Sequence, residues 1–259
     1  MNINSIFYIV LLSLFFLISF GGVVLRLIRY RKGKNVPIVQ ALTLSDETIV
    51  RISKLTFFFF LMSTVLFAVF SQGGYSDDDY AHYLYSHYSL FHHVLILDLW
   101  NRPVFTFLTM LPAQLGFIYF RLTNVVISAV TVYLTYLLAK RKKLVHPALV
   151  FPLLSFASYF FLLSFSGLTE PAFGLFLIIF LLLKDTQKEN LSALAAGCLP
   201  FIRPEGIVIL PFIVISYIRK RSYLPIIILI IPAFIYMVLS FLITGDALFG
   251  LKSIPYLGS

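Results

Sequence analysis

The chain is a series of long apolar segments separated by short polar connections. A helix needs about 20 mostly apolar residues to cross a bilayer, and shorter segments suffice where the protein thins or shields the membrane. We therefore expect an all-α, polytopic transmembrane helical protein. The pattern predicts about eight spans, which in chain order are Ile6–Leu25, Leu55–Phe70, Leu122–Ala139, Leu144–Leu163, Pro171–Leu183, Leu191–Ile202, Ile207–Ile218 and Leu224–Ile243.

The composition indicates lipid as the main solvent. The 259 residues are 60% hydrophobic, and only 12% are Asp, Glu, Lys or Arg, whereas a soluble domain carries about 25% charged residues. The net charge of +9 does not indicate nucleic-acid binding, because the basic residues stand in short clusters between apolar segments, as membrane anchors do. Cys198 is the only cysteine, so no internal disulfide can form.

The basic residues predict how the spans are oriented. Of the 20 Lys and Arg residues, 16 fall in alternate connections, which the positive-inside rule assigns to the cytoplasm. The N-terminus is then outside. Because the inner loops are basic and no retention signal is found, we expect a multi-pass protein of a prokaryotic plasma membrane. The basic residues left on the outer side are Arg102, Arg121, Arg203 and Lys252.

Two apolar segments need a further decision. Ile6–Leu25 could be a signal peptide, but its basic residues follow the apolar stretch instead of preceding it, so we expect an anchor. Treating Val104–Phe120 as a full span would put the basic stretch Lys140–Lys143 outside. We therefore expect Val104–Phe120 to be an interfacial or re-entrant helix in the first outer loop.

The outer connections carry few charges, and most of them are acidic. Asp77, Asp78 and Asp79 follow the second span, and three adjacent carboxylates should raise at least one pKa unless a cation lies nearby. The alternative interpretation is a solvated loop or a helix N-cap, where Asp is favoured. Because generic solvation would need more charges, we expect one polar site on the extracytoplasmic side. The remaining outer acidic residues are Asp98, Glu170, Glu205 and Asp246.

Aromatic residues and histidines are concentrated in Tyr80–Trp100. Tyr and Trp favour the membrane interface, so we expect an interfacial helix here. His82 and His93 would share a helix face, but no zinc-binding spacing such as HExxH is present. We therefore favour interfacial or structural histidines over metal ligands.

Two later outer motifs place charges at helix ends. Ser166–Pro171 contains Glu170, and Phe201–Gly206 contains Arg203 and Glu205. A capped turn with a local ion pair would also explain Arg203 and Glu205. An Arg guanidinium presents forked donors suited to phosphate, and a carboxylate can act as general base on a hydroxyl. With a lipid-accessible cavity, these groups suit transfer of a chemical group from a lipid-linked phosphate donor.

In their order along the chain, these motifs resemble the GT-C superfamily of polytopic glycosyltransferases, which use polyprenyl-phosphate sugars on the extracytoplasmic or luminal face. The resemblance covers about Leu55–Lys252. The motifs that carry it are Asp77-Asp78-Asp79-Tyr80 with Tyr85, Asn101-Arg102-Pro103, Arg121-Leu122, Thr169-Glu170-Pro171, Arg203-Pro204-Glu205-Gly206, and Gly245-Asp246 followed by Lys252.

The resemblance implies an inverting glycosyltransferase of the hexosyltransferase type. One of Asp77, Asp78 and Asp79 would be the general base. The Asp-Asp-x-Tyr pattern favours Asp77 and Asp78, whereas the spacing to Tyr83 favours Asp79. A divalent ion such as Mg²⁺ or Mn²⁺ is compatible but not required, with Asp78, Asp79 and Glu170 as candidate ligands. The resemblance assigns substrate or phosphate binding to Arg102, Arg121, Glu170, Arg203, Glu205, Asp246 and Lys252.

We expect two parts: an N-terminal anchor with a basic cytoplasmic loop over residues 1–54, and a minimal or truncated GT-C-like catalytic module over 55–259. The acceptor could be a lipid, a glycan or a protein. A transporter stays open as an alternative, although it would favour internal repeats and ionisable groups near the midplane. A non-catalytic subunit of a glycan-assembly complex is the third interpretation.

Overall fold

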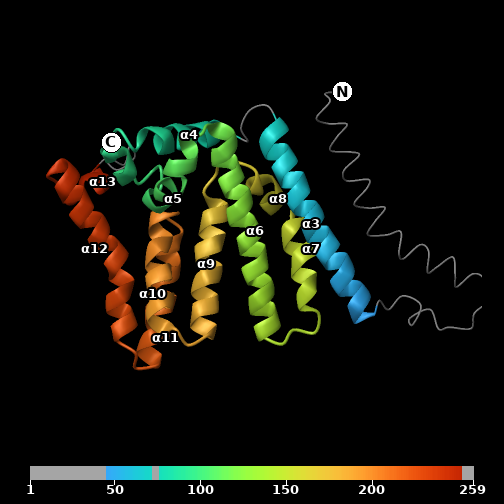
Figure 1. Ribbon diagram of the computed structural model, residues 1–259. Coiled ribbons are helices and arrows are strands. Elements are labelled where there is room, and N and C mark those ends of the chain that lie inside the picture. The colour runs from blue at the N-terminus through green and yellow to red at the C-terminus, as the bar shows by residue number, and fades with distance from the viewer. Residues whose placement is uncertain (1–44, 72–75, 253–259) are drawn as a thin grey trace, which may run out of the picture.

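The computed structural model describes residues 45–71 and 76–252, so the predicted span Ile6–Leu25 lies outside the described residues. Within the described ranges every regular element is a helix (Figure 1), which confirms the all-α class. The elements are α3 (Asp46–Phe70), α4 (Asp77–Tyr88), η1 (His93–Leu97), α5 (Pro103–Ala113), α6 (Phe117–Arg141), η2 (Pro147–Leu149), α7 (Val150–Ser155), α8 (Ser158–Ser164), α9 (Glu170–Asp185), α10 (Glu189–Cys198), η3 (Leu199–Phe201), α11 (Gly206–Arg219), α12 (Leu224–Thr244) and α13 (Phe249–Lys252).

Three of the described helices, α3, α6 and α12, are long and apolar enough to cross a membrane. Pro147–Ser155 and Ser158–Ser164 together add a fourth candidate if they form one broken span, bent by 73°. The helices α9, α10 and α11 have 16, 10 and 14 residues. At about 1.5 Å per residue, each is shorter than the hydrocarbon core of about 30 Å. The described residues thus contain fewer full-length spans than the apolar pattern predicts.

The second predicted span, Leu55–Phe70, is the apolar part of a longer helix. Helix α3 begins at Asp46, and the Ser45 hydroxyl accepts a hydrogen bond from the Thr48 backbone N–H at 3.3 Å. Asp46 and Glu47 occupy the first turn, where negative charge is favoured by the helix dipole. Local capping therefore extends the helix by several polar residues that hydropathy alone cannot assign.

Two other predicted segments are interrupted. Val104–Phe120 is not one helix: α5 ends at Ala113, and α6 begins at Phe117 after a turn in which Gly116 has a φ of 113°. Glycine is the residue that adopts such an angle without strain. Leu144–Leu163 divides into η2, α7 and α8. Pro147 and Pro152 lack an N–H donor, which weakens a continuous helix, but nothing in the sequence at the bend itself explains its position.

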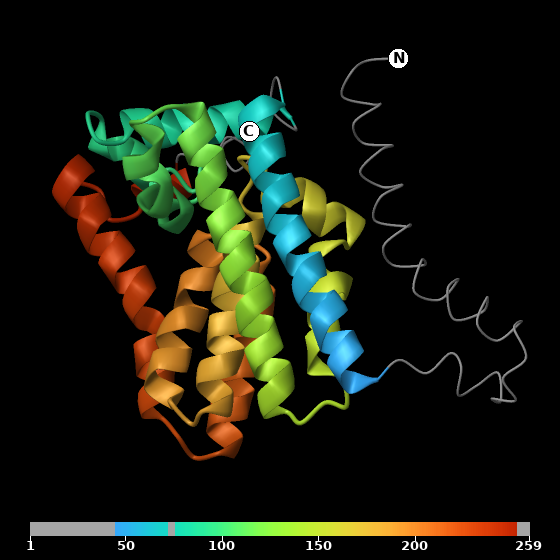
Figure 2. The same cartoon turned by 45° about the vertical axis from the view of Figure 1, so that its right-hand side comes forward.

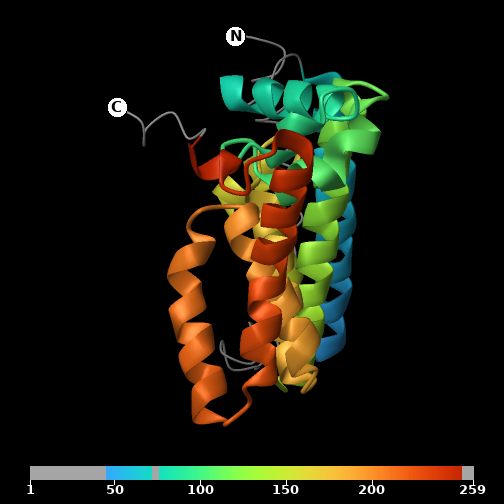
Figure 3. The same cartoon turned by 90° about the vertical axis from the view of Figure 1, so that its left-hand side faces the viewer.

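The long helices run side by side, and their connections fall at two opposite ends (Figure 1). Helix α4 lies across one end of the bundle, and Figures 2 and 3 show this from two further directions. We call this the α4 end. It also contains the first residues of α6, α9 and α11. The opposite end, here the basic end, contains Lys140–Lys143, Lys184, Lys188 and Arg219–Arg221. The separation of charge predicted from the sequence is thus present in the fold.

Aromatic and aliphatic side chains form the contacts between the helices. Phe60 of α3 packs with Phe151 and Phe161 of the bent segment. The helices α9, α10, α11 and α12 share a second cluster that includes Tyr217. Outward-facing positions are also apolar, for example Phe234, whose exposed fraction is 64%. Apolar groups inside and outside the bundle are consistent with a lipid bilayer environment.

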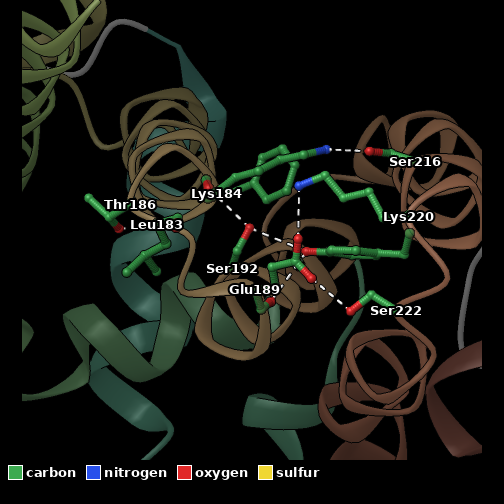
Figure 4. Close-up of polar contacts among 10 residues, drawn as sticks. Leu183, Lys184, Thr186, Glu189, Ser192, Ser216, Lys220 and Ser222 are labelled. Carbon is green, nitrogen blue, oxygen red and sulfur yellow. Dashed lines mark hydrogen bonds and ion pairs between the residues drawn. The ribbon is translucent and has the colours of Figure 1, made fainter.

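A polar network ties α9, α10, α11 and the turn before α12 together at the basic end (Figure 4). The Glu189 carboxylate accepts hydrogen bonds from Lys220 Nζ at 2.8 Å and from Ser222 Oγ at 2.7 Å. Lys184 Nζ donates to Ser216 Oγ at 2.8 Å. Each charged group in this network has a partner, so we interpret the network as structural.

Candidate functional site

Three segments converge at the α4 end: the first turn of α4, the loop before α9 and the turn before α11. Gly167 in the second segment lies against the first, because a Cβ atom there would be 2.9 Å from the Asp79 carbonyl oxygen and 2.7 Å from a Phe120 ring carbon. Only glycine fits such a close approach without a shift. Arg203 in the third segment forms an ion pair with Glu170 at the start of α9, which joins the second and third segments.

Arg203 is the centre of a three-residue ion cluster. Its guanidinium contacts Glu170 through Nη1 and Glu205 through two further bonds, Nη2 to Oε1 at 2.8 Å and Nε to Oε2 at 3.2 Å. The paired geometry is the forked contact that arginine makes best with carboxylates. The hydrogen bonds with Glu205 raise the pKa of Arg203 and, from the other side, lower the pKa of Glu205. Arg203 and Glu205 therefore both stay ionised at neutral pH.

Glu170 keeps one oxygen without a hydrogen-bond donor. Its Oε1 faces Arg203, whereas its Oε2 is buried and accepts no hydrogen bond from any residue within 45–71 or 76–252. A buried carboxylate oxygen that lacks a donor is uncommon, and a missing ligand or water often explains it. Glu170 can therefore accept a hydrogen bond from a bound molecule while it holds Arg203.

A second arginine, Arg102, lies close enough to Arg203 for the two charges to repel. Burial is the main cause that lowers the pKa of Arg102, and the Arg203 charge is the next. The backbone of Arg102 has a φ of 67° directly before Pro103, a conformation uncommon outside glycine. Its Nη1 donates to the Leu99 carbonyl at 2.6 Å. Two neighbouring guanidinium groups that repel one another favour an anion between them.

The three adjacent aspartates differ in exposure. Asp79 is fully buried, with an exposed fraction of 0%, whereas Asp77 and Asp78 are exposed. The Asp79 charge interacts with Arg121. The first turn of a helix suits all three carboxylates, but only Asp77 and Asp78 are accessible to a molecule that arrives from solvent.

Arg121 connects three segments of the protein. It is 3% exposed, and its guanidinium donates to the carbonyl oxygens of Phe165 at 2.8 Å, Phe67 at 3.2 Å and Ser71 at 3.2 Å. None of these contacts involves the Arg203 cluster. The bonds fix the end of α3 to α6, and a role of Arg121 in phosphate binding stays a prediction.

Asp246 and Lys252 form an ion pair with each other. Lys252 Nζ contacts Asp246 Oδ2 at 2.5 Å, and the Leu248 N–H donates to Asp246 Oδ1 at 2.9 Å. The bond from Lys252 is the main cause that lowers the pKa of Asp246. Neither residue pairs with Arg203 in the described structure, so the sequence-predicted site residues fall into separate groups.

His82 belongs to a buried polar chain that the sequence does not reveal. Its Nδ1 lies 2.7 Å from Asn101 Oδ1, and Asn101 Nδ2 donates to Thr106 Oγ1 at 2.5 Å. Burial is the main cause that lowers the pKa of His82, and the charges of Arg102, Asp78 and Glu170 also act on it. Asp78 and His82 are four residues apart, a spacing that indicates a shared helix face. The contact between His82 and Asn101 spans 19 residues and depends on tertiary packing.

A metal ion at Asp78, Asp79 and Glu170 stays a prediction. Within residues 45–71 and 76–252, no three His, Cys, Asp or Glu side chains gather closely enough to suggest a metal site. Comparison with protein-family models, curated proteins and solved structures gives no match for the chain. The function must therefore be argued from the chemistry of the site.

Proposed function

We propose that the chain is a multi-pass membrane glycosyltransferase that transfers a sugar from a polyprenyl-phosphate donor to an acceptor hydroxyl, with inversion at the anomeric carbon. One observation carries this proposal. The ion cluster of Glu170, Arg203 and Glu205 lies with Arg102 at the same end of the bundle as the carboxylates that open α4. Transfer of a sugar from a lipid phosphate requires fixed cations for the phosphate and an accessible carboxylate for the acceptor, and both kinds of group lie at the α4 end.

The arginines suit the leaving group. In the reaction the bond between the anomeric carbon and the phosphate oxygen breaks, and negative charge grows on the phosphate. Arg203 is held in place by two carboxylates, and Arg102 is partly buried beside it. Donors that are already oriented toward developing charge stabilise a transition state without a cost of reorganisation. We assign Arg203, with Arg102, to the phosphate of the donor.

An exposed carboxylate of α4 suits the base. The base takes the proton of the acceptor hydroxyl as its oxygen bonds to the anomeric carbon from the face opposite the phosphate. Asp78 is exposed, and its charge acts on His82, on which the Glu170 charge also acts. Asp79 is buried. We therefore assign the base to Asp78 and a supporting role to Asp79.

The membrane supplies the donor in this proposal. The polyprenyl chain lies in the bilayer among about eight spans, some of which are short or bent, and the phosphate lies at the α4 end on the extracytoplasmic face. The α4 end is assigned to the extracytoplasmic face, because the opposite end carries the basic residues that the positive-inside rule assigns to the cytoplasm. We propose a prokaryotic plasma membrane as the location.

The proposal is tested by transfer of radiolabelled sugar from a panel of polyprenyl-phosphate sugars in membranes that contain the chain. We expect Asp78→Asn to abolish transfer, and Asp77→Asn and Asp79→Asn to retain more of it.

Asp46→Asn is the matched control, since Asp46 is also an exposed aspartate in the first turn of a helix, at the basic end. Unchanged transfer in all three α4 variants would contradict the base assignment. No transfer by the wild-type chain, despite membrane insertion, would favour a transporter or a non-catalytic subunit.

A further inference from the structure

We propose that His82 binds a hydroxyl group of the sugar substrate through Nε2. This inference rests on the proposed function and adds a binding residue that the motifs at the α4 end do not include. Asn101, Trp100 and the charges of the site carry the argument.

The first step is the tautomer of the imidazole ring. The Thr106 hydroxyl lies 3.2 Å from the Asn101 carbonyl, to which it donates, so its oxygen accepts from Asn101 Nδ2. The amide of Asn101 is thereby oriented with Oδ1 toward His82. Because Oδ1 can only accept, His82 Nδ1 must carry the hydrogen of the 2.7 Å bond. In the neutral ring the proton is then on Nδ1, and Nε2 presents a lone pair.

The second step is the rigidity of the ring. His82 is 6% exposed. Its ring stacks on Trp100 with a centroid distance of 5.2 Å and meets the edge of Phe105 at 5.8 Å. Burial lowers the pKa of His82, so the ring remains neutral and Nε2 remains an acceptor at neutral pH. A ring held by stacking and by one hydrogen bond loses little entropy when a ligand binds.

The third step is the surroundings of Nε2. This nitrogen makes no hydrogen bond with any residue that the structure describes. The charges of Asp78, Arg102 and Glu170 all act on the imidazole, although they come from α4, the start of α5 and the start of α9. His82 is thus the neutral acceptor among the charged groups assigned to the reaction. A sugar hydroxyl that donates to Nε2 would then lie within the electrostatic influence of the proposed base.

His87 on the same helix provides a contrast. Its Nδ1 bonds to the Ala113 backbone carbonyl at 3.0 Å, which fixes α4 to α5. His87 is therefore a structural histidine, and it gives a matched control for substitution.

Two substitutions separate binding from structure. In His82→Asn the amide nitrogen can replace Nδ1 as donor to Asn101, but the Nε2 acceptor is lost. In His82→Gln the amide oxygen can replace Nε2 as acceptor. We expect His82→Asn to raise KM about tenfold, the cost of one lost hydrogen bond to substrate, and His82→Gln to restore most of the binding. His87→Asn should leave KM unchanged.

KM is measured separately for the polyprenyl-phosphate sugar and for the acceptor. We expect the rise for the polyprenyl-phosphate sugar, whereas a rise for the acceptor alone would contradict the assignment of the hydroxyl to the donor sugar. If the wild-type chain transfers sugar and His82→Asn has the same KM as the wild type for both substrates, this inference is overturned and the proposed function is left intact. The inference is also overturned if His82→Asn lowers the melting temperature and His82→Gln gives no recovery of KM, because His82 would then be structural. No transfer by the wild-type chain overturns both.

Discussion

At the scale of single residues, Arg203 carries the strongest prediction, because one guanidinium holds two carboxylates from different segments. Arg203→Gln should lower the rate of sugar transfer about 100-fold or more, the usual effect of removing one oriented donor from a developing negative charge. Arg203→Lys keeps the charge but loses the forked geometry, so we expect an intermediate rate. Both rates are measured at saturating donor.

A matched control is available for Arg203. Arg51 also forms an arginine–glutamate pair, with Glu47 at 3.6 Å, but at the basic end and with side chains that are 75% and 86% exposed. Arg51→Gln should leave transfer unchanged, because exposed pairs contribute little. An equal loss of transfer in Arg203→Gln and Arg51→Gln would mean that the assay reports expression or membrane insertion. That result would contradict the role of Arg203 in the reaction.

Only part of this site could be predicted from the sequence. Arg203 and Glu205 are two residues apart, so their ion pair was one of the interpretations that the sequence itself offered. The contact between Arg203 and Glu170 spans more than thirty residues and depends on how η3 and the turn after it lie against the start of α9. The partnership of His82 with Asn101 likewise depends on α4 crossing the end of the bundle. Local spacing cannot reveal contacts of this kind.

At the scale of elements, hydropathy located the helices better than it located their ends. The prediction Leu224–Ile243 agrees closely with α12, whose sequence is mostly apolar. The start of α3 was missed, because Ser45 and the acidic first turn extend the helix through capping and charge instead of hydropathy. The bend between α7 and α8 was also missed. Hydropathy reports the solvent of a segment and is insensitive to how its backbone hydrogen bonds are arranged.

Gly197 controls how closely α10 and α12 approach. A Cβ atom at this position would overlap the Leu229 carbonyl and lie 3.0 Å from a Pro232 ring carbon. Gly197→Ala should therefore separate the two helices and cost about 1–3 kcal/mol of stability. The measurement is the melting temperature of the purified protein in detergent, which should fall by several degrees.

Gly174 in α9 is the control for this prediction. A Cβ atom there would lie 3.6 Å from the Thr131 methyl carbon, an ordinary contact. Gly174→Ala should keep or slightly raise the melting temperature, because alanine reduces the freedom of the unfolded chain. Equal melting temperatures for Gly197→Ala and the wild type would show that α10 and α12 are less tightly packed than described.

Glu189 gives the basic end a predicted pH dependence. Hydrogen bonds from Lys220 and Ser222 are the largest causes that lower its pKa. A lowered pKa in the folded state means that the carboxylate stabilises the fold above its unfolded pKa of about 4.3, and that this contribution is lost as the pH falls through the folded value. Glu189→Gln should therefore lower the melting temperature at pH 7.

The difference in melting temperature between the wild type and Glu189→Gln should shrink as the pH falls below about 4. Glu47→Gln is the control, since Glu47 is an exposed glutamate at the same end whose pair with Arg51 lies on the surface. It should show no pH-dependent difference. A constant gap between the wild type and Glu189→Gln from pH 7 to pH 3 would contradict the role of the ionised carboxylate.

At the scale of the whole molecule, the fold separates two kinds of charge. The basic clusters lie at one end, and the carboxylate-rich segments with Arg102 and Arg203 lie at the other. Positive charge near the cytoplasmic membrane surface sets the orientation of a membrane protein. The basic end is enough to explain that orientation, so the ion cluster at the α4 end is not needed for it. This separation is what the proposed function expects: one end would orient the protein in the bilayer, and the other would carry the reaction.

The orientation itself can be measured with single cysteines, because Cys198 is the only native one. In a Cys198→Ala background, Phe91→Cys places a thiol at the α4 end and Val145→Cys places one at the basic end, at positions where the native side chains are 70% and 86% exposed. A membrane-impermeant maleimide added to intact cells should label the cysteine at position 91. The cysteine at position 145 should react only after the cells are permeabilised. Because neither native side chain is buried in the protein, a difference in labelling does not arise from burial in the fold and reports the side of the membrane. The reverse pattern would put the Arg203 cluster in the cytoplasm and would exclude a reaction on the extracytoplasmic face.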